Sequence, residues 1–133
     1  MKRYLKIDDL TQIVINAAYK VHNTLGAGFL EKIYEKALFL ELKKIDIEVE
    51  CQYPIAVFYD GEEIGKYYAD LYADGQLIIE LKSVENLTVA HEKQVVNYLA
   101  ATGIDNGLLI NFGSSVQIKR KYRVYKKPVI SQD

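Results

Sequence analysis

The sequence predicts an α/β fold in which helices pack on both faces of one mixed β-sheet. Apolar residues recur at helical spacing in three segments, near residues 8–25, 28–44 and 88–103. Residues 47–84 instead alternate polar and apolar side chains, as antiparallel strands do, and two further strand-like segments follow the third helix. Since 133 residues bury one core rather than two, we expect a single domain over residues 1–133.

The composition narrows the class of protein. Half of the residues are hydrophobic and 26% are charged, which is ordinary for a globular chain. The formal net charge of -1 provides no global attraction to nucleic acid, so such binding would come from a local patch. The single cysteine, Cys51, excludes an internal disulfide and a thiolate zinc site, and no apolar run is long enough for a signal peptide or a membrane span. We therefore expect a cytoplasmic protein without a membrane partner.

The first two segments predict helices. The apolar face of the first helix consists of Leu10, Ile13, Val14, Ala17 and Val21. Asp8 or Asp9 is available as its N-cap, and Gly26 lies just past its end. The second helix is expected to begin near Gly28 and to continue to Lys44. Its predicted apolar face consists of Leu30, Ile33, Ala37 and Leu38.

The remaining segments predict five strands and one helix. Asp60-Gly61 and Asp74-Gly75 are turn pairs that divide residues 47–84 into a three-strand antiparallel meander. The helix at 88–103 ends at Gly103 and carries the chain to a fourth strand, 107–112, by a crossover. A last strand begins at Val116, and its lysines discourage edge-to-edge association.

The turn between the second and third strands decides whether an acidic site forms. A one-residue change of register moves every side chain of a strand to the other face of the sheet. With a two-residue loop, Asp74-Gly75, Ala73 would oppose Gln76. Asp70 and Glu80 would then lie on opposite faces, where no metal ion could join them.

A three-residue loop, Ala73-Asp74-Gly75, gives the opposite result. Tyr72 would oppose Gln76 and Asp70 would oppose Ile78, so that Asp70 and Glu80 become diagonal neighbours on one face. This register collects an entirely apolar set of side chains on the other face: Ala69, Leu71, Ala73, Leu77, Ile79 and Leu81. We therefore expect the three-residue loop.

Asp70, Glu80 and Lys82 are then the residue types that metal-dependent phosphodiester hydrolysis requires. Two carboxylates on one face are hard oxygen ligands of the kind that Mg²⁺ or Mn²⁺ prefers. The ammonium group of Lys82, on the same face, would orient the attacking water or stabilise charge on the phosphate. By itself, however, an E-x-K strand is more typical of a solvated surface pair.

A wider pattern resembles a known family. Asp70, the Glu80-x-Lys82 strand and Gln94-x-x-x-Tyr98 resemble the PD-(D/E)XK nuclease superfamily in its recombination-type exonuclease branch. The resemblance implies a restriction-endonuclease-like sheet, Mg²⁺-dependent cleavage of DNA in repair, recombination or defence, and a catalytic role for Gln94 beside the metal. The proline of the superfamily's name is absent, because Ala69 precedes Asp70.

The segment Gly28–Tyr34 further resembles the signature of the GxxExxY family within that superfamily. This resemblance implies that Glu31 is a further metal ligand, against the alternative of a solvated helix glutamate. Tyr34, on the same helix, is expected to contact nucleic acid. Tyr98 is either a contact to nucleic acid or a half-buried core aromatic.

The last strand predicts a nucleic-acid contact as well. Its basic residues are Lys119, Arg120, Lys121, Arg123, Lys126 and Lys127. Interleaved tyrosines and the lack of acidic residues are typical of phosphate contact and stacking, and equally of a charged edge that aids solubility.

Two other functions compete with a DNA nuclease. One is a catalytically silent module that keeps the fold and binds nucleic acid or protein. The other is a structural subunit of a homodimer or larger assembly, paired through the edge strand at residues 116–125. An intact set of Asp70, Glu80 and Lys82 favours the nuclease, because a binding module gains nothing from two buried carboxylates beside a phosphate.

Overall fold

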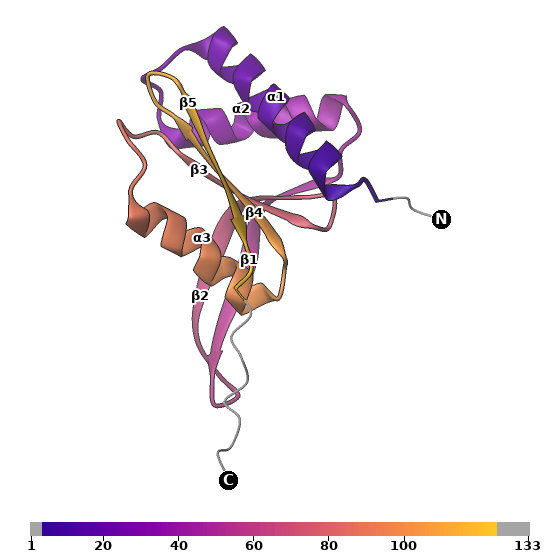
Figure 1. The fold of residues 1–133 in the computed structure, drawn as a ribbon, viewed down its shortest axis with the longest axis vertical. Helices are drawn as coiled ribbons and strands as arrows, with labels where there is room; N and C mark the ends of the chain where they lie inside the picture. The colour runs from indigo at the N-terminus through magenta and orange to yellow at the C-terminus, as the bar shows by residue number, and fades with distance from the viewer. Residues whose placement is uncertain (1–3, 125–133) are drawn as a thin grey trace.

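The computed structural model describes residues 4–124, and these form the α/β fold that the sequence predicts (Figure 1). The elements are α1 (Ile7–Leu25), α2 (Glu31–Lys44), β1 (Val49–Tyr59), β2 (Glu62–Ala73), β3 (Leu77–Lys82), α3 (Val89–Thr102), β4 (Asn106–Phe112) and β5 (Val116–Tyr122). The expected order of two helices, three strands, one helix and two strands is confirmed.

The strands form one mixed sheet in the order β1-β2-β3-β4-β5. Neighbours pair antiparallel except β3 and β4, which pair in parallel because α3 returns the chain across one face of the sheet. The far ends of β1 and β2 project from the body of the molecule as a long hairpin (Figure 1). No helix within residues 4–124 is long and apolar enough to cross a membrane.

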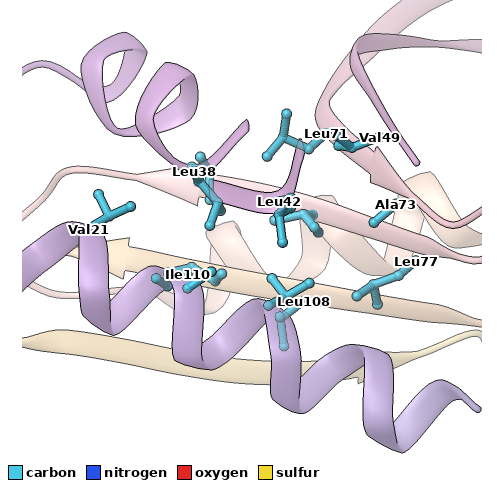
Figure 2. Close-up of a cluster of buried hydrophobic side chains, with 14 of the residues drawn as sticks. Val21, Leu38, Leu42, Val49, Leu71, Ala73, Leu77, Leu108 and Ile110 are labelled. Carbon is cyan, nitrogen blue, oxygen red and sulfur yellow. The ribbon is translucent and has the colours of Figure 1, made fainter. Parts of the chain in front are cut away.

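Two hydrophobic clusters hold the helices on the sheet. The larger cluster joins α1 and α2 to one face of the sheet, and its labelled members are Val21, Leu38, Leu42, Val49, Leu71, Ala73, Leu77, Leu108 and Ile110 (Figure 2). The smaller cluster contains residues of β1–β3 and α3, namely Ile55, Ala69, Ile78, Tyr98 and Leu99. Each large side chain that is fully buried contributes roughly 1.5–3 kcal/mol, so the larger cluster fixes the position of α2.

The ends of the first two helices differ from the prediction. The N-cap of α1 is Lys6, with no side-chain cap, and Asp8 and Asp9 lie inside the first turn, where their charges favour the helix dipole. Gly26 follows the helix at φ 76°, as expected. The helix α2 begins at Glu31 rather than near Gly28, with extended Leu30 before it.

The buried face of α2 also differs from the predicted one. Leu30 is 80% exposed and Ile33 is 43% exposed. The buried residues of α2 are Tyr34, Glu35, Leu38 and Leu42. The prediction was wrong for Leu30 and Ile33, because apolar residues cover both sides of this helix and only the tertiary contacts select one side. It is confirmed for Leu38, which is fully buried, and for Ala37, which packs against the larger cluster.

The turn between β2 and β3 combines features of the two loops considered. Asp74 and Gly75 have φ of 53° and 65°, and the Gln76 amide donates to the Ala73 carbonyl at 3.0 Å, which closes a two-residue turn of type I′. The strand pairing nevertheless joins Ala73 to Leu77, so Gln76 is an extra residue. The loop is therefore Asp74-Gly75-Gln76.

The resulting register corrects the predicted pairs and keeps their consequence. Tyr72 opposes Ile78, not Gln76, and Leu71 opposes Ile79. The predicted pairing of Asp70 with Ile78 is thus wrong. Moving the pairing by two residues preserves the side of each side chain, because the side-chain period of a strand is two.

The predicted apolar face is interrupted at Asp70. Leu71 belongs to the larger cluster, whereas Ala69, two residues away, belongs to the smaller one. In the neighbouring strand Gln52 has φ 52°, a left-handed conformation that no regular strand contains. The alternation of β2 is therefore broken at the residue that carries the candidate site.

Packing between β4 and α3 generates the first prediction. A Cβ atom added to Gly107 would lie 2.7 Å from Cγ1 of Val95, a side chain with little freedom to move. We expect Gly107→Ala to lower the free energy of unfolding by about 1–3 kcal/mol, measured by urea denaturation. Gly65→Ala is the matched control, because a Cβ there meets nothing within 4 Å.

Adding Gly107→Ala to the Val95→Ala variant should recover part of the stability that Val95→Ala alone loses. Equal effects of alanine at Gly107 and Gly65 would contradict the packing explanation.

Candidate active site

Strands β2 and β3 stop pairing where their acidic residues lie. The ladder between them ends at Leu71 and Ile79. Beyond it, the Asp70 amide donates to Oε1 of Glu80 at 2.9 Å, and the Leu81 amide donates to Oδ2 of Asp70 at 2.8 Å. Each carboxylate thus takes the place of a backbone carbonyl of its own strand, and we call this pair of bonds the Asp70–Glu80 clasp.

Burial makes the charged form of this pair costly. Asp70 is 8% exposed and Glu80 is 4% exposed. Burial raises the pKa of Glu80 to about 8, with a further contribution from the charge of Asp70, against the opposing effects of the Asp70 amide and Lys82. Burial also raises the pKa of Asp70, although the bond from the Leu81 amide opposes this shift.

Helix α2 brings two more carboxyl groups to the clasp. Glu31 and Glu35 lie one helical turn apart, and both interact with Asp70: the charge of Glu31 raises the Asp70 pKa, and Glu35 is in hydrogen-bonding contact with it. Burial raises the pKa of Glu35 itself. Lys32 Nζ donates to both oxygens of Glu35, at 3.2 and 3.3 Å, and Gln52 Nε2 donates to Oε1 at 3.0 Å.

Glu35 is a residue of the site that was not predicted from the sequence. Its spacing of four residues from Glu31 places it on the same helix face, and this spacing was the available signal. The spacing alone does not indicate a site residue, because only the structure shows that Glu35 is 4% exposed and faces Asp70.

Lys82 and α3 complete the surroundings of Glu80. Lys82 follows Glu80 by two residues on β3, and its charge acts on the Glu80 carboxyl group. Tyr98 is 5% exposed, and burial together with the charges of Glu80 and Asp70 raises its pKa to about 12, opposed by a contact with Gln94. Tyr98 is thus close to the acidic pair, and Gln94 contacts Tyr98, which also belongs to the smaller hydrophobic cluster.

Tyr34 is a core residue and offers no surface to nucleic acid, which corrects its predicted role. Its side chain is fully buried, and its ring stacks on Phe112 with centroids 4.6 Å apart and planes 4° apart. Its hydroxyl donates to the Gly26 carbonyl at 2.6 Å and accepts from the Phe29 amide at 3.2 Å. Tyr34 therefore anchors the loop that leads into α2.

The basic residues near the C-terminal end of the described chain do not all lie on one face of the sheet, and their contact with nucleic acid stays a prediction. Lys121 pairs with Glu92 at 3.0 Å, and Arg123 pairs with Asp105 at 2.7 Å. Arg120 lines a small hollow with Asp8 of α1. Lys126 and Lys127 lie outside the described residues. Consecutive strand residues point to opposite faces, and this alternation separates Lys119 from Arg120.

Lys119 is the member of the set that shares a row with the candidate site. Glu80 pairs with Leu109, and Leu109 pairs with Lys119, so the three residues lie in line across β3, β4 and β5. Residues paired directly across strands point to the same face, and two strand spacings amount to roughly 10 Å. Lys119 is exposed and lies on the sheet face of Glu80, and its charge also acts on Glu92 of α3.

The donor types at the clasp fit a divalent cation. Four carboxyl groups meet in a largely buried place, where unpaired negative charges would repel each other strongly. Oxygen ligands of this kind suit Mg²⁺ or Mn²⁺. Within residues 4–124, however, no three His, Cys, Asp or Glu side chains are already arranged as a metal site. The repulsion among the carboxyl groups is reduced because their raised pKa values favour the protonated form, and because backbone amides and Lys32 donate hydrogen bonds to them.

Comparisons with known proteins agree with this fold. A family model described as "PD-(D/E)XK nuclease superfamily" matches residues 8–123. A solved structure titled "Crystal structure of SSO0001" is 18% identical in sequence, with a TM-score of 0.52. The match covers 90% of this chain and 61% of that chain, so the present chain spans less than two thirds of its structural relative. No curated protein matches the sequence.

The raised pKa of Glu80 predicts how stability depends on pH. The pKa of this group is about 8 in the folded protein and 4.5 for an ordinary glutamate. Between these pH values the unfolded chain has released its proton and the folded protein still holds it, so stability falls as the pH rises. Glu80→Gln does not titrate, and its free energy of unfolding should exceed the wild-type value increasingly across this range, by on the order of several kcal/mol at pH 8.

Urea denaturation in a chelator at pH 4.5 and at pH 8 measures this difference. Glu50→Gln, at an exposed position of β1, is the control and should show no such trend. A pH-independent difference between Glu80→Gln and the wild type would contradict the raised pKa.

Proposed function

Because the chain belongs to the PD-(D/E)XK nuclease superfamily, we propose that it is a divalent-metal-dependent nuclease that hydrolyses DNA phosphodiester bonds, in repair, recombination or defence. The observation that carries this proposal is the Asp70–Glu80 clasp, with Lys82 on the same strand as Glu80. Buried carboxyl groups with raised pKa values are costly to a scaffold and typical of functional sites.

The side chains at the clasp divide the work of hydrolysis. Asp70, Glu80 and Glu31 would hold Mg²⁺ or Mn²⁺, with Glu35 beside them. The ion, when bound, supplies positive charge to the phosphate and to the attacking water. Lys82 orients that water and stabilises negative charge on the phosphate oxygens. Gln94, on α3, donates a hydrogen bond to the water or to a phosphate oxygen.

The segment Gly28–Tyr34 supports a narrower assignment to the GxxExxY family. Gly28 has φ 103°, a conformation that favours glycine. Glu31 faces Asp70, and Tyr34 ties the preceding loop to the core. Gly28 and Tyr34 of the signature thus serve the fold, and Glu31 serves the site.

Variants of Lys82 and Glu80 should fail in different ways. Lys82→Ala should reduce cleavage by roughly 10²- to 10³-fold and keep metal binding, because lysine serves the water and the transition state. Glu80→Ala should lose both cleavage and the heat of Mg²⁺ or Mn²⁺ binding measured by calorimetry. Lys66→Ala, an exposed change on β2, is the control.

Cleavage would be measured with single-stranded, duplex and branched DNA and with RNA, each with Mg²⁺, Mn²⁺ or a chelator. Full activity of Lys82→Ala would refute its role. Nucleic-acid binding by the wild type without cleavage of any substrate would favour the catalytically silent module.

Lys119 and Arg120 provide a matched test of where DNA lies. Both side chains are exposed, but only Lys119 shares a row and a face with Glu80. Each lost phosphate contact removes about one unit from the slope of log affinity against log salt concentration. We expect this loss for Lys119→Ala and an unchanged slope for Arg120→Ala, with Ca²⁺ in place of Mg²⁺. Equal slopes for both variants would place the DNA elsewhere.

A further inference from the structure

An open groove of about 340 Å³ lies between α3 and the β1–β2 hairpin. Val57 and Tyr67 of the hairpin form one wall, and one face of α3 forms the other. We call this feature the α3 groove. Of the residues assigned to the hydrolytic reaction, Gln94 alone lines this groove. The function of the groove therefore requires a separate explanation.

The groove exists because the α3 side chains that face the hairpin are small or polar. Ala90 and Ala101 lie at its two ends, and Lys93 and Asn97 lie between them. These positions recur at spacings of three and four residues, which places them on one side of the helix. A helix face that packed against the hairpin would carry large apolar residues here.

The walls of the groove present chemistry that suits a nucleotide. Tyr67 is 52% exposed, and its ring centroid lies 5.5 Å from that of Tyr98, with the planes inclined by 43°. An exposed aromatic face is a platform on which a base stacks. The amide of Asn97 matches the hydrogen-bonding groups on a base edge, and the ammonium group of Lys93 matches a phosphate.

The groove adjoins the candidate active site through Tyr98. Gln94 and Tyr98 both line it, and the hydroxyl of Tyr98 lies within the electrostatic influence of Glu80 and Asp70. An occupant of the groove would therefore be a close neighbour of the phosphate at the clasp. This proximity selects a nucleotide of the substrate strand over an unrelated ligand.

We propose that the α3 groove binds one unpaired nucleotide of the substrate, with its base on Tyr67, its polar edge at Asn97 and its phosphate at Lys93. A base inside a duplex is stacked on both sides and cannot reach such a wall, so the groove selects strands with an unstacked base next to the cleaved bond. This inference rests on the proposed nuclease function and adds Tyr67, Lys93 and Asn97 as substrate-binding residues.

Tyr67 and Tyr68 provide a matched test. They are adjacent on β2 and almost equally exposed, at 52% and 51%, but point to opposite sides of the strand. With Ca²⁺ in place of Mg²⁺, Tyr67→Ala should weaken binding of a single-stranded oligonucleotide by roughly 5- to 100-fold, the equivalent of one lost base stack. Tyr67→Phe should bind as the wild type does, and Tyr68→Ala should change the affinity less than twofold. Binding of a blunt duplex should be the same for all of these proteins.

Filling the groove tests the same proposal without removing a ring. Ala101→Leu places a larger side chain at one end of the groove, whereas Ala100→Leu adds it to an exposed position turned away from the groove. Only Ala101→Leu should weaken single-strand binding, and it should also lower the ratio of single-strand to duplex cleavage. Thermal unfolding of both variants checks that each remains folded.

The outcomes separate this inference from the proposed function. Binding that depends on Tyr67 but not on Tyr68 supports the groove even if cleavage is not detected. Cleavage with equal effects of Tyr67→Ala and Tyr68→Ala, or equal losses on single-stranded and duplex DNA, would overturn the groove and leave the nuclease proposal standing. Failure of the wild type to bind any single-stranded oligonucleotide would also overturn it.

Discussion

The Asp70–Glu80 clasp is the interaction on which the rest of the site depends. Two adjacent strands lose their backbone ladder, and each strand's amide is satisfied by a carboxylate of the other. Buried amides need hydrogen-bond acceptors, and buried carboxylates need donors or counter-charges. The clasp satisfies both requirements with the same two hydrogen bonds. It also holds two acidic groups together in a low dielectric, which is why the pKa of Glu80 rises to about 8. A cation that replaced the protons would relieve the same repulsion.

Helix α2 can serve this clasp only because it is held firmly from the other side. The stack of Tyr34 on Phe112, together with Leu38 and Leu42 in the larger cluster, fixes the rotation of the helix about its axis. That rotation turns Glu31 and Glu35 toward Asp70 and leaves Ile33 exposed. Residues that take no part in chemistry thus decide which carboxyl groups reach the site.

Helix α3 has two faces with different tasks. Val95 and Leu99 pack closely against Gly107 of β4, so close that a single added methyl group is not accommodated. The face toward the β1–β2 hairpin is instead open, and its polar side chains lie beside Gln94 and Tyr98. Rigid support on one side and an unfilled groove on the other are what a substrate-binding element requires.

The sequence by itself determined the order of the elements, the helical crossover from β3 to β4 and the acidic residues of β2 and β3, because hydrophobic period, turn residues and crossover connections are local or nearly local properties. It also predicted that Asp70 and Glu80 share a site, although the loop that it favoured contains Ala73 in place of Gln76. Only the tertiary structure decided the buried face of α2, the inclusion of Glu35, the burial of Tyr34 and the ion pair of Lys121 with Glu92. Each of these depends on which side of an element meets a neighbour distant in sequence, and that choice follows from packing rather than from local propensity.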